Sequence, residues 1–371
     1  MHPTDREQRI VVVLGMHRSG TSVITRGLQT LGVCLGEHLL PEADDNPKGF
    51  WEDADVNALN IDLLATLGHD WHTFAPIRHG ELAAPVVNDF KLRALAILRD
   101  RLRLTDCFGL KDPRIARLLG FWQEVFRHLQ LNASYVIVCR NPLSVARSLA
   151  KRNGFEVEKG YYLWLEHVLE SLVKTEEQLR IVVDYDLFLD DPARQLRRIA
   201  HTLGLNFDPG NSNLAEFIAE FVEGSLRHNQ YQIEDLPLDQ ALPPAALELY
   251  KATLALASDT LAFESTAFKS LQEHLSEQAR YLYPALLYMQ ALEERASSAA
   301  RQRDQQTAAL NHALAAQQAE IGRLNQEVFS LRTQLSAIHG SRAWKFVCSV
   351  RSLVALFRVR RSTQAHEFQP E

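Results

Sequence analysis

The loop at residues 15–22, which reads GMHRSGTS, has the composition of an anion-binding loop. It follows an apolar, β-branched run at residues 10–14 that is typical of a buried parallel strand, and a helical pattern comes after it. Backbone N–H groups in such a loop, together with the N-terminus of the next helix, attract phosphate or sulfate. A plain strand-to-helix turn is the alternative. It is disfavoured because five of the six residues 17–22 carry a side-chain donor or a positive charge.

A nucleotide-hydrolysing P-loop would need different residues. Its Gly-Lys-Ser/Thr sequence is absent, and Arg18 supplies the cation immediately before Ser19 and Gly20. No apolar strand ends in an aspartate well placed to hold magnesium, because the nearest candidate, Asp112, is followed directly by Pro113. The sequence therefore predicts no metal site. A P-loop kinase or nucleotide hydrolase stays as the second hypothesis.

Two further polar side chains follow the clearest predicted strand, at residues 133–139. Arg140 stands directly after this strand, and Ser148 lies eight residues later in a helix that Pro142 starts. A cation at the carboxyl edge of a sheet and a hydroxyl on the next helix can both face one phosphate. The pair therefore indicates a second phosphate contact.

Together, the two motifs resemble those of the PAPS-dependent sulfotransferases, whose sulfate donor is 3′-phosphoadenosine 5′-phosphosulfate (PAPS). In that family a loop of the pattern Lys/Arg-Ser/Thr-Gly-Ser/Thr-Ser/Thr holds the 5′-phosphosulfate. An Arg and a Ser eight residues later hold the 3′-phosphate. The resemblance implies that the donor is bound by Arg18, Ser19, Gly20, Thr21, Ser22, Arg140 and Ser148. The implied reaction moves a sulfuryl group from PAPS to an acceptor hydroxyl and needs no metal.

Four more segments extend the resemblance over about residues 8–230. NPKGFWE at residues 46–52 and LKDPR at residues 110–114 look like segments of bacterial members; the alternative for Lys111 is a strand-end salt bridge with Asp112. The stretch that starts at Tyr185 and the late loop that contains Arg227 also resemble the family. Tyr185 and Arg227 are therefore added to the expected donor-binding residues.

The resemblance also implies catalytic roles for two cations and a carboxylate. Arg18 and Lys111 are expected to stabilise the negative charge that builds on the leaving phosphate. A general base must take the acceptor proton, and the family uses Glu or His, often from the segment after the first helix. Glu52 ranks first because it closes the NPKGFWE segment, and Glu37 ranks second. His17 is a further base candidate.

These motifs need a scaffold in which strands and helices alternate. Short apolar runs at residues 10–14, 108–110, 133–139 and 181–183 alternate with helical patterns, including one at residues 161–179. This order predicts an α/β fold at residues 8–235: a P-loop-type, three-layer arrangement around a central parallel sheet. Prolines 237, 243 and 244 mark its boundary, and a helical segment is expected at residues 236–300.

The C-terminal part carries a different pattern. Apolar residues recur at spacings of four and three from Leu310 to Ile338, which predicts a coiled coil at residues 301–340 and hence a homo-oligomer. A single amphipathic helix packed on the body is the alternative. Residues 341–361 then form a basic amphipathic pattern, which predicts contact with a membrane surface; docking on its own protein is the other interpretation.

The same tail bears on the acceptor. It resembles tails on bacterial enzymes that build surface polysaccharides at the inner membrane face, and this likeness implies a carbohydrate or glycolipid acceptor. A membrane-recruiting scaffold with a degenerate nucleotide-binding domain is a third hypothesis. The intact set of Arg18, Lys111, Arg140 and Ser148 disfavours such degeneracy.

Composition limits the class of protein. Of the 371 residues, 46% are hydrophobic and 23% charged, which excludes wholesale disorder and a many-pass membrane protein. The net charge of −6 argues against a general nucleic-acid binder, although residues 332–361 contain seven Lys/Arg and no Asp or Glu. The four cysteines are widely spaced, and the N-terminus is polar. These features predict a cytoplasmic protein that is at most peripheral on the inner membrane face.

Overall fold

The computed structural model describes residues 8–43, 46, 48–222 and 231–364. The chain divides into two compact units, Met1–Ala291 and Leu292–Glu371. The first contains a parallel sheet of four strands in the order β2-β1-β3-β4. These strands are β1 (Arg9–Leu14), β2 (Cys107–Lys111), β3 (Asn132–Cys139) and β4 (Leu179–Asp184). The parallel sheet predicted from the alternating apolar runs is therefore confirmed.

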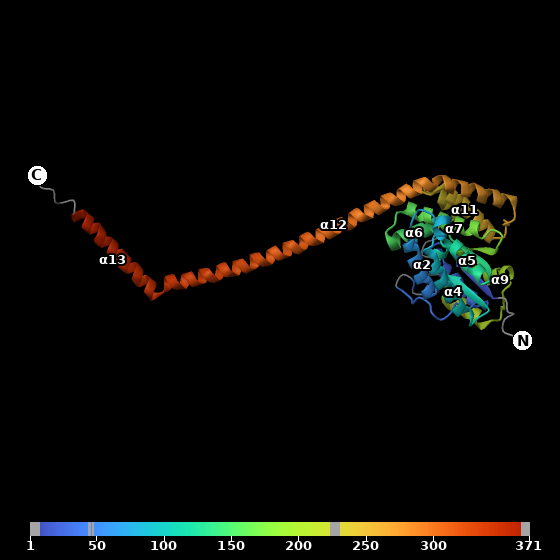
Figure 1. Ribbon diagram of the computed structural model, residues 1–371, viewed down its shortest axis with the longest axis horizontal. Coiled ribbons are helices and arrows are strands. Elements are labelled where there is room, and N and C mark those ends of the chain that lie inside the picture. Colours follow the sequence, from blue (N-terminus) through green and yellow to red (C-terminus); the bar gives the residue numbers. More distant parts are fainter. Residues whose placement is uncertain (1–7, 44–45, 47, 223–230, 365–371) are drawn as a thin grey trace. The chain divides into compact units, whose positions relative to one another are not determined.

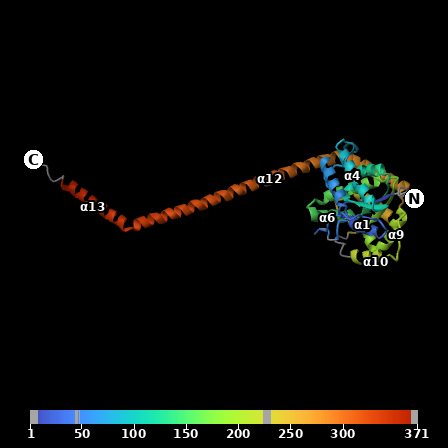
Figure 2. The same ribbon diagram turned by 60° about the horizontal axis from the view of Figure 1, so that its bottom comes forward.

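The sheet presents two apolar faces because side chains alternate along each strand. One face is covered by α1 (Thr21–Gln29), α8 (Tyr185–Asp190), α9 (Pro192–Leu203), α10 (Ser212–Glu216) and η2 (Phe217–Phe221). The other is covered by α2 (Ala54–Thr66), α4 (Val87–Leu102), α5 (Leu119–His128), α6 (Pro142–Asn153), α7 (Val157–Lys174) and α11 (Pro244–Ala257). Figures 1 and 2 show helices on both sides of the strands, with α4 and α10 at opposite sides in Figure 2. The three-layer prediction is thus confirmed.

The order of the strands creates a switch point between β1 and β3. The chain leaves β1 for α1 on one face and leaves β3 for α6 on the other face. Their carboxyl ends are in register, since Leu14 pairs with Ile137. Ligands of open α/β sheets bind outside the carboxyl ends of the strands at such a point. The two predicted phosphate motifs follow β1 and β3 and therefore start at this place.

One predicted helix has the wrong bounds. The pattern at residues 161–179 predicted a helix that ends at Leu179, but α7 ends at Lys174 and Leu179 is the first residue of β4. The chain reverses between them, where Glu177 has a left-handed backbone with φ of 64°. The apolar spacing simply continues across this turn, so it gave no sign of the boundary.

The core of the first unit extends beyond residue 235. Short elements fill its connections: α3 (His79–Leu82), η1 (Pro113–Ala116) and η4 (Ile233–Leu238). Leu249 and Leu256 of α11 are buried in the same apolar cluster as α7 and β3. The helix at residues 244–257 is therefore part of this core.

The second unit is helical. Helix α12 (Thr266–Gly340) crosses into it from the first unit, and α13 (Arg342–Gln364) follows after the interruption at Ser341. The apolar heptad positions from Leu310 to Ile338 are 46% to 70% exposed. Among the residues that the structure describes, no helix is both long enough and apolar enough to cross a membrane.

Candidate active site

The loop between β1 and α1 has a tightly curled backbone. Arg18 and Gly20 both adopt left-handed conformations, with φ of 70° and 88°, and the N–H of Ser19 donates to the carbonyl of Met16 at 3.1 Å. A left-handed backbone at a non-glycine residue is uncommon and often marks a functional site. A Cβ atom on Gly20 would lie 2.0 Å from the ring of Tyr185. Glycine therefore lets the loop lie directly against this ring.

The two predicted phosphate motifs are in contact with one another. The Nε of Arg18 donates to Oγ of Ser148 at 3.0 Å, and Nη1 of Arg140 donates to the carbonyl of Arg18 at 3.2 Å. Arg140 is buried; its Cζ lies 4.4 Å from the centre of the Tyr185 ring, a cation–π contact. Its carbonyl accepts a hydrogen bond from Nε1 of Trp164 at 3.0 Å. The loop after β1 and the end of β3 thus form one site.

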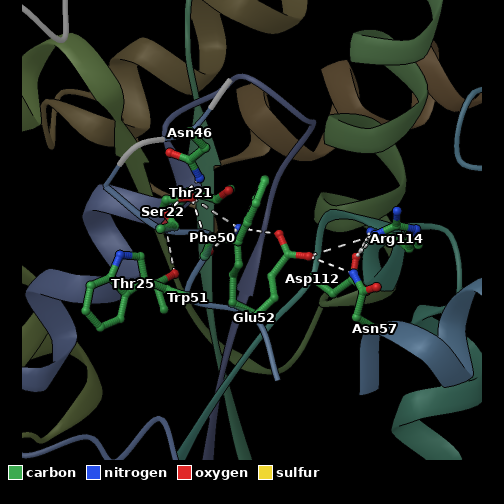
Figure 3. Close-up of polar contacts among 12 residues, drawn as sticks. Thr21, Ser22, Thr25, Asn46, Phe50, Trp51, Glu52, Asn57, Asp112 and Arg114 are labelled. Carbon is green, nitrogen blue, oxygen red and sulfur yellow. Dashed lines mark hydrogen bonds and ion pairs between the residues drawn. The ribbon is translucent and has the colours of Figure 1, made fainter. Parts of the chain in front are cut away.

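Lys111, the last residue of β2, lies beside the N-terminus of α1. Its Nζ donates to Oε1 of Glu52 at 2.7 Å, to the carbonyl of Phe50 at 2.8 Å and to Oγ of Ser22 at 3.3 Å. Figure 3 shows these three acceptors gathered in one place. An ammonium group has three protons to donate, so these acceptors use its full capacity. Lys111 is also buried, and its position is therefore tightly fixed.

Glu52 is a buried carboxylate between two cations. Besides Lys111, its Oε2 accepts from Nδ2 of Asn57 at 2.9 Å and lies 3.9 Å from Nη1 of Arg114. Burial raises the pKa of Glu52, and the attraction of Lys111 opposes this rise only in part. A carboxylate with a raised pKa is better suited to accept a proton near neutral pH.

The alternative expectation for Lys111, a salt bridge with Asp112, is wrong. Asp112 accepts instead from Nδ2 of Asn60 at 3.0 Å, and from the backbone N–H and Nη1 of Arg114 at 2.9 and 3.0 Å. Successive side chains of an extended segment point to opposite sides, so these neighbours do not pair. Asp112 caps η1 and holds the Arg114 side chain near Glu52.

The other predicted residues lie in different settings. Glu37 is exposed, whereas Glu52 contacts Lys111. Arg227 lies outside the described residues, as does the rest of the late loop at residues 225–228. Of the two carboxylates considered as general base, the structure thus brings only Glu52 to the expected catalytic lysine.

His17, the residue before Arg18, packs against an aromatic side chain from another segment. Its ring centre lies 4.3 Å from that of Trp71. Its Nε2 atom is buried and has no hydrogen-bond partner. Burial above all, and then the charge of Arg114, hold the pKa of His17 well below its usual range. The imidazole is therefore neutral, with a buried nitrogen that would be satisfied by a further polar group.

A comparison with protein families now adds to this geometry. A family model described as "Sulfotransferase family" matches residues 11–209, which includes both phosphate motifs, Glu52 and Lys111. The chain belongs to the sulfotransferase family. It is therefore an enzyme that transfers sulfuryl groups. No curated protein matches the chain.

Solved structures similar to this sulfotransferase include two sulfotransferase domains. The domain from the curacin biosynthetic pathway is 15% identical, with a TM-score of 0.37, and the match covers 74% of this chain and 98% of that one. The domain from the Synechococcus PCC 7002 olefin synthase is also 15% identical, with a TM-score of 0.35 and coverage of 75% and 97%. A retinol dehydratase in complex with retinol and PAP is 14% identical, with a TM-score of 0.30 and coverage of 76% and 83%.

Several residues at or beside the candidate site of this sulfotransferase carry no signal in the sequence. Asn57 lies within an ordinary helical pattern, Trp71 lies in a loop, and Arg152 lies late in α6. None belongs to a local motif. Asn57 contacts Glu52 from five residues away, whereas Trp71 contacts His17, and Arg152 contacts Trp71, only in the folded chain. In the part of the chain that the structure describes, no group of three or more His, Cys, Asp or Glu side chains is arranged to hold a metal ion.

Proposed function

We propose that this sulfotransferase uses PAPS as its donor and modifies a hydroxyl of a carbohydrate or glycolipid in the synthesis of a bacterial surface polysaccharide. One observation carries the donor assignment. Arg140 contacts Arg18 and Arg18 contacts Ser148, so that cations and a hydroxyl from two motifs meet at one switch point. A nucleotide with phosphates at both its 3′ and 5′ positions needs two such neighbouring anion sites.

The loop has the donor groups that such a ligand needs. Oγ of Ser19 is buried without a hydrogen-bond partner, and a buried hydroxyl of this kind is normally satisfied by a partner or a ligand. The first N–H groups of α1, which begins at Thr21, have no acceptor within the helix. Ser19, Thr21 and Ser22 would therefore hold the 5′-phosphosulfate. Arg140 and Ser148 would hold the 3′-phosphate. The ring of Tyr185 packs against the loop at Gly20.

Lys111 and Arg18 supply positive charge for the reaction. When bound, PAPS supplies a sulfonate that is activated by its bond to a phosphate. Lys111 lies by Ser22 at the start of α1, where its charge would stabilise an oxygen that becomes negative as that bond breaks. It must then exchange one of its present acceptors for this oxygen, because all three of its protons are engaged.

Glu52 is the proposed general base. Its Oε1 lies at Lys111 and its Oε2 at Asn57, so the carboxylate has a fixed orientation beside the charge that marks the reacting centre. It would accept the proton of the acceptor hydroxyl as the sulfuryl group is transferred. Glu37 is the weaker proposal for this role because it is exposed.

The C-terminal unit supports proposals for partners and location. The exposed apolar seam from Leu310 to Ile338 favours a homo-oligomer, since a second copy would cover it. The apolar residues Phe346, Val350 and Leu353 of α13 are also exposed, and the surrounding sequence is basic. This arrangement favours a cytoplasmic enzyme that binds peripherally to the inner membrane face, close to lipid-linked sugars.

An assay with labelled PAPS tests the proposed function. The full-length protein is incubated with labelled PAPS and a set of polysaccharides and lipid-linked sugars, and label transfer and free PAP are both measured. Transfer without added metal is the expected result. ATP turnover that needs magnesium would support a kinase or nucleotide hydrolase instead. If neither activity is found and calorimetry shows no heat of PAP binding, the result would support the membrane-recruiting scaffold with a degenerate nucleotide-binding domain.

A further inference from the structure

Beside the phosphate loop lies a group of aromatic and cationic side chains that the donor does not explain. We call it the aromatic–cation cluster, and it consists of Trp71, His72, Arg152, Phe155 and Lys159. The ring centre of Trp71 lies 5.2 Å from that of His72 and 5.6 Å from that of Phe155. All three rings are half-buried, so the cluster reaches the surface of the protein.

The cluster is continuous with the site. Trp71 packs on His17, which directly precedes Arg18 in the phosphate loop. Arg152 lies one turn of α6 beyond Ser148, the residue that Arg18 contacts. Residues four apart share one face of a helix. The face of α6 that meets the loop at Ser148 therefore continues into the cluster.

Positive charge is concentrated here together with the rings. Cζ of Arg152 lies 5.5 Å from the centre of the Trp71 ring. Nζ of Lys159 lies 4.7 Å from the Phe155 ring and 3.3 Å from Nδ1 of His72. Arg152 and Lys111 are also among the charges that lower the pKa of His17. Arg152 and Lys159 thus place two positive charges in the cluster, and Asp70 is an acidic neighbour, with its Oδ2 3.3 Å from Nε2 of His72.

A buried arginine holds the segment that carries Trp71 in place. Arg117 is fully buried, donates to the carbonyls of Thr73 and Ala75, and lies 3.1 Å from Oε2 of Glu166. A buried arginine that binds backbone carbonyls fixes the course of a loop. The position of Trp71 is thus prepared before any ligand binds, which reduces the entropy cost of recognition.

We propose that the aromatic–cation cluster binds the acceptor, and that this acceptor is a sugar with a carboxylate, phosphate or sulfate group near the hydroxyl that is modified. Aromatic rings offer the apolar surface that sugar rings pack on, and Arg152 offers a fork of donors that suits these anions. Arg152 is half-exposed, and its Nε donates to Oδ1 of the neighbouring Asn153 at 2.7 Å; its guanidinium would turn to the anionic group of the acceptor, while buried Lys159 adds positive charge. The inference rests on the proposed function, because it concerns the acceptor of the same site.

A glycan array with the full-length protein tests this inference. The array carries neutral glycans and their uronate-, phosphate- and sulfate-bearing counterparts, and is probed with and without PAP. The expected result is that anionic glycans are retained and that Arg152→Gln weakens their binding by at least about tenfold, the effect of losing one charged hydrogen bond. Binding to neutral glycans should not change, and Arg152→Lys should restore part of the loss.

The matched control is Arg147→Gln. Arg147 lies on the same helix, is exposed, and its replacement removes the same charge. Retention of neutral glycans alone, retention of none, or equal losses in the Arg147 and Arg152 variants would each overturn the inference. Calorimetry with PAP on the same proteins distinguishes failure of the proposed donor from failure of the acceptor inference. If the wild type does not bind PAP, the proposed donor is wrong. The array without PAP reports on the acceptor alone.

Discussion

Glu52 and Lys111 form a buried ion pair that joins the segment before α2 to the end of β2, with Nζ 2.7 Å from Oε1. Both side chains are almost fully enclosed. A buried pair of this kind is weak evidence for stability, because desolvation offsets much of the attraction. Its placement beside Ser22 and the phosphate loop favours a role in the reaction over a role in stability. The pair sets the proposed general base next to the cation that would face the sulfonate.

Glu52→Gln should lower turnover by at least about 100-fold, which is a typical contribution of a general base. PAP binding should be largely retained because the amide still fills the space and accepts from Lys111. Turnover with labelled PAPS and calorimetry with PAP check the two parts. Glu37→Gln is the matched control and should turn over normally, since Glu37 is exposed. Near-normal turnover of the Glu52 variant would remove this residue from the mechanism.

Arg140→Ala should weaken binding of 3′,5′-ADP by about 10- to 100-fold and that of 5′-AMP much less. The reason is that Arg140 is assigned to the 3′-phosphate, which only the first nucleotide carries. Calorimetry with both nucleotides gives the comparison, and Arg147→Ala provides an exposed arginine as control. An equal loss for both nucleotides would show that Arg140 acts on the loop through its bond to the Arg18 carbonyl, and does not read the 3′-phosphate.

Gly20→Ala and Gly32→Ala form a matched pair for the phosphate loop. Both glycines have left-handed backbones, with φ of 88° and 83°, so each alanine costs about 1–2 kcal/mol of strain. Only at Gly20 would the new Cβ also collide with Tyr185, while Gly32 has open space. Gly20→Ala should therefore lower the free energy of unfolding further and weaken PAP binding, as denaturant titration and calorimetry would show. Equal effects would mean that the contact with Tyr185 does not shape the loop.

Much of the fold was predictable from the sequence because its signals are local. The apolar runs of β1 and β3 stand out by composition, and Pro142 and Gly20 mark where the following helices begin. The phosphate loop and Arg140 were predictable for a related reason. They stand directly after strands, and the carboxyl ends of parallel strands meet at one edge.

The rest of the site depends on contacts between distant segments. Glu52 meets Lys111 across 59 residues of sequence, and Trp71 reaches His17 from a loop without a motif. The spacing of charges also misled, since Lys111 and Asp112 are adjacent in sequence yet choose different partners. Partner choice between buried charges is set by the direction of each side chain, which periodicity does not encode.

Stability should depend on pH through Glu166. Burial raises the pKa of this carboxyl to about 7, although Arg117 lies 3.1 Å away. Its pKa in the unfolded chain is about 4.3, so folding takes up a proton between these values. The stabilising contribution is complete below the unfolded pKa and is lost as the pH rises to about 7, at about 1.4 kcal/mol for each pKa unit.

Thermal unfolding of Glu166→Gln measured across this range checks the contribution. The variant should lose much of the fall in melting temperature that the wild type shows between about pH 5 and pH 7. Glu158→Gln is the control on the same helix, because Glu158 is exposed and is not among the groups that shift the pKa of Glu166. If the melting temperatures of the wild type and Glu166→Gln change with pH in the same way, Glu166 does not take up this proton.

Two truncations separate the roles proposed for the C-terminal unit. A chain that ends at Gly340 lacks α13 and should lose association with anionic liposomes, but it should still self-associate through residues 301–340. A chain that ends at about Ala308 should lose both properties, because the apolar seam begins at Leu310. Both should bind PAP like the full-length protein, since the compact first unit ends at Ala291. Liposome flotation and light scattering measure the two properties. Unchanged flotation of the first truncation would reject the membrane anchor, and self-association of the second would reject the coiled coil.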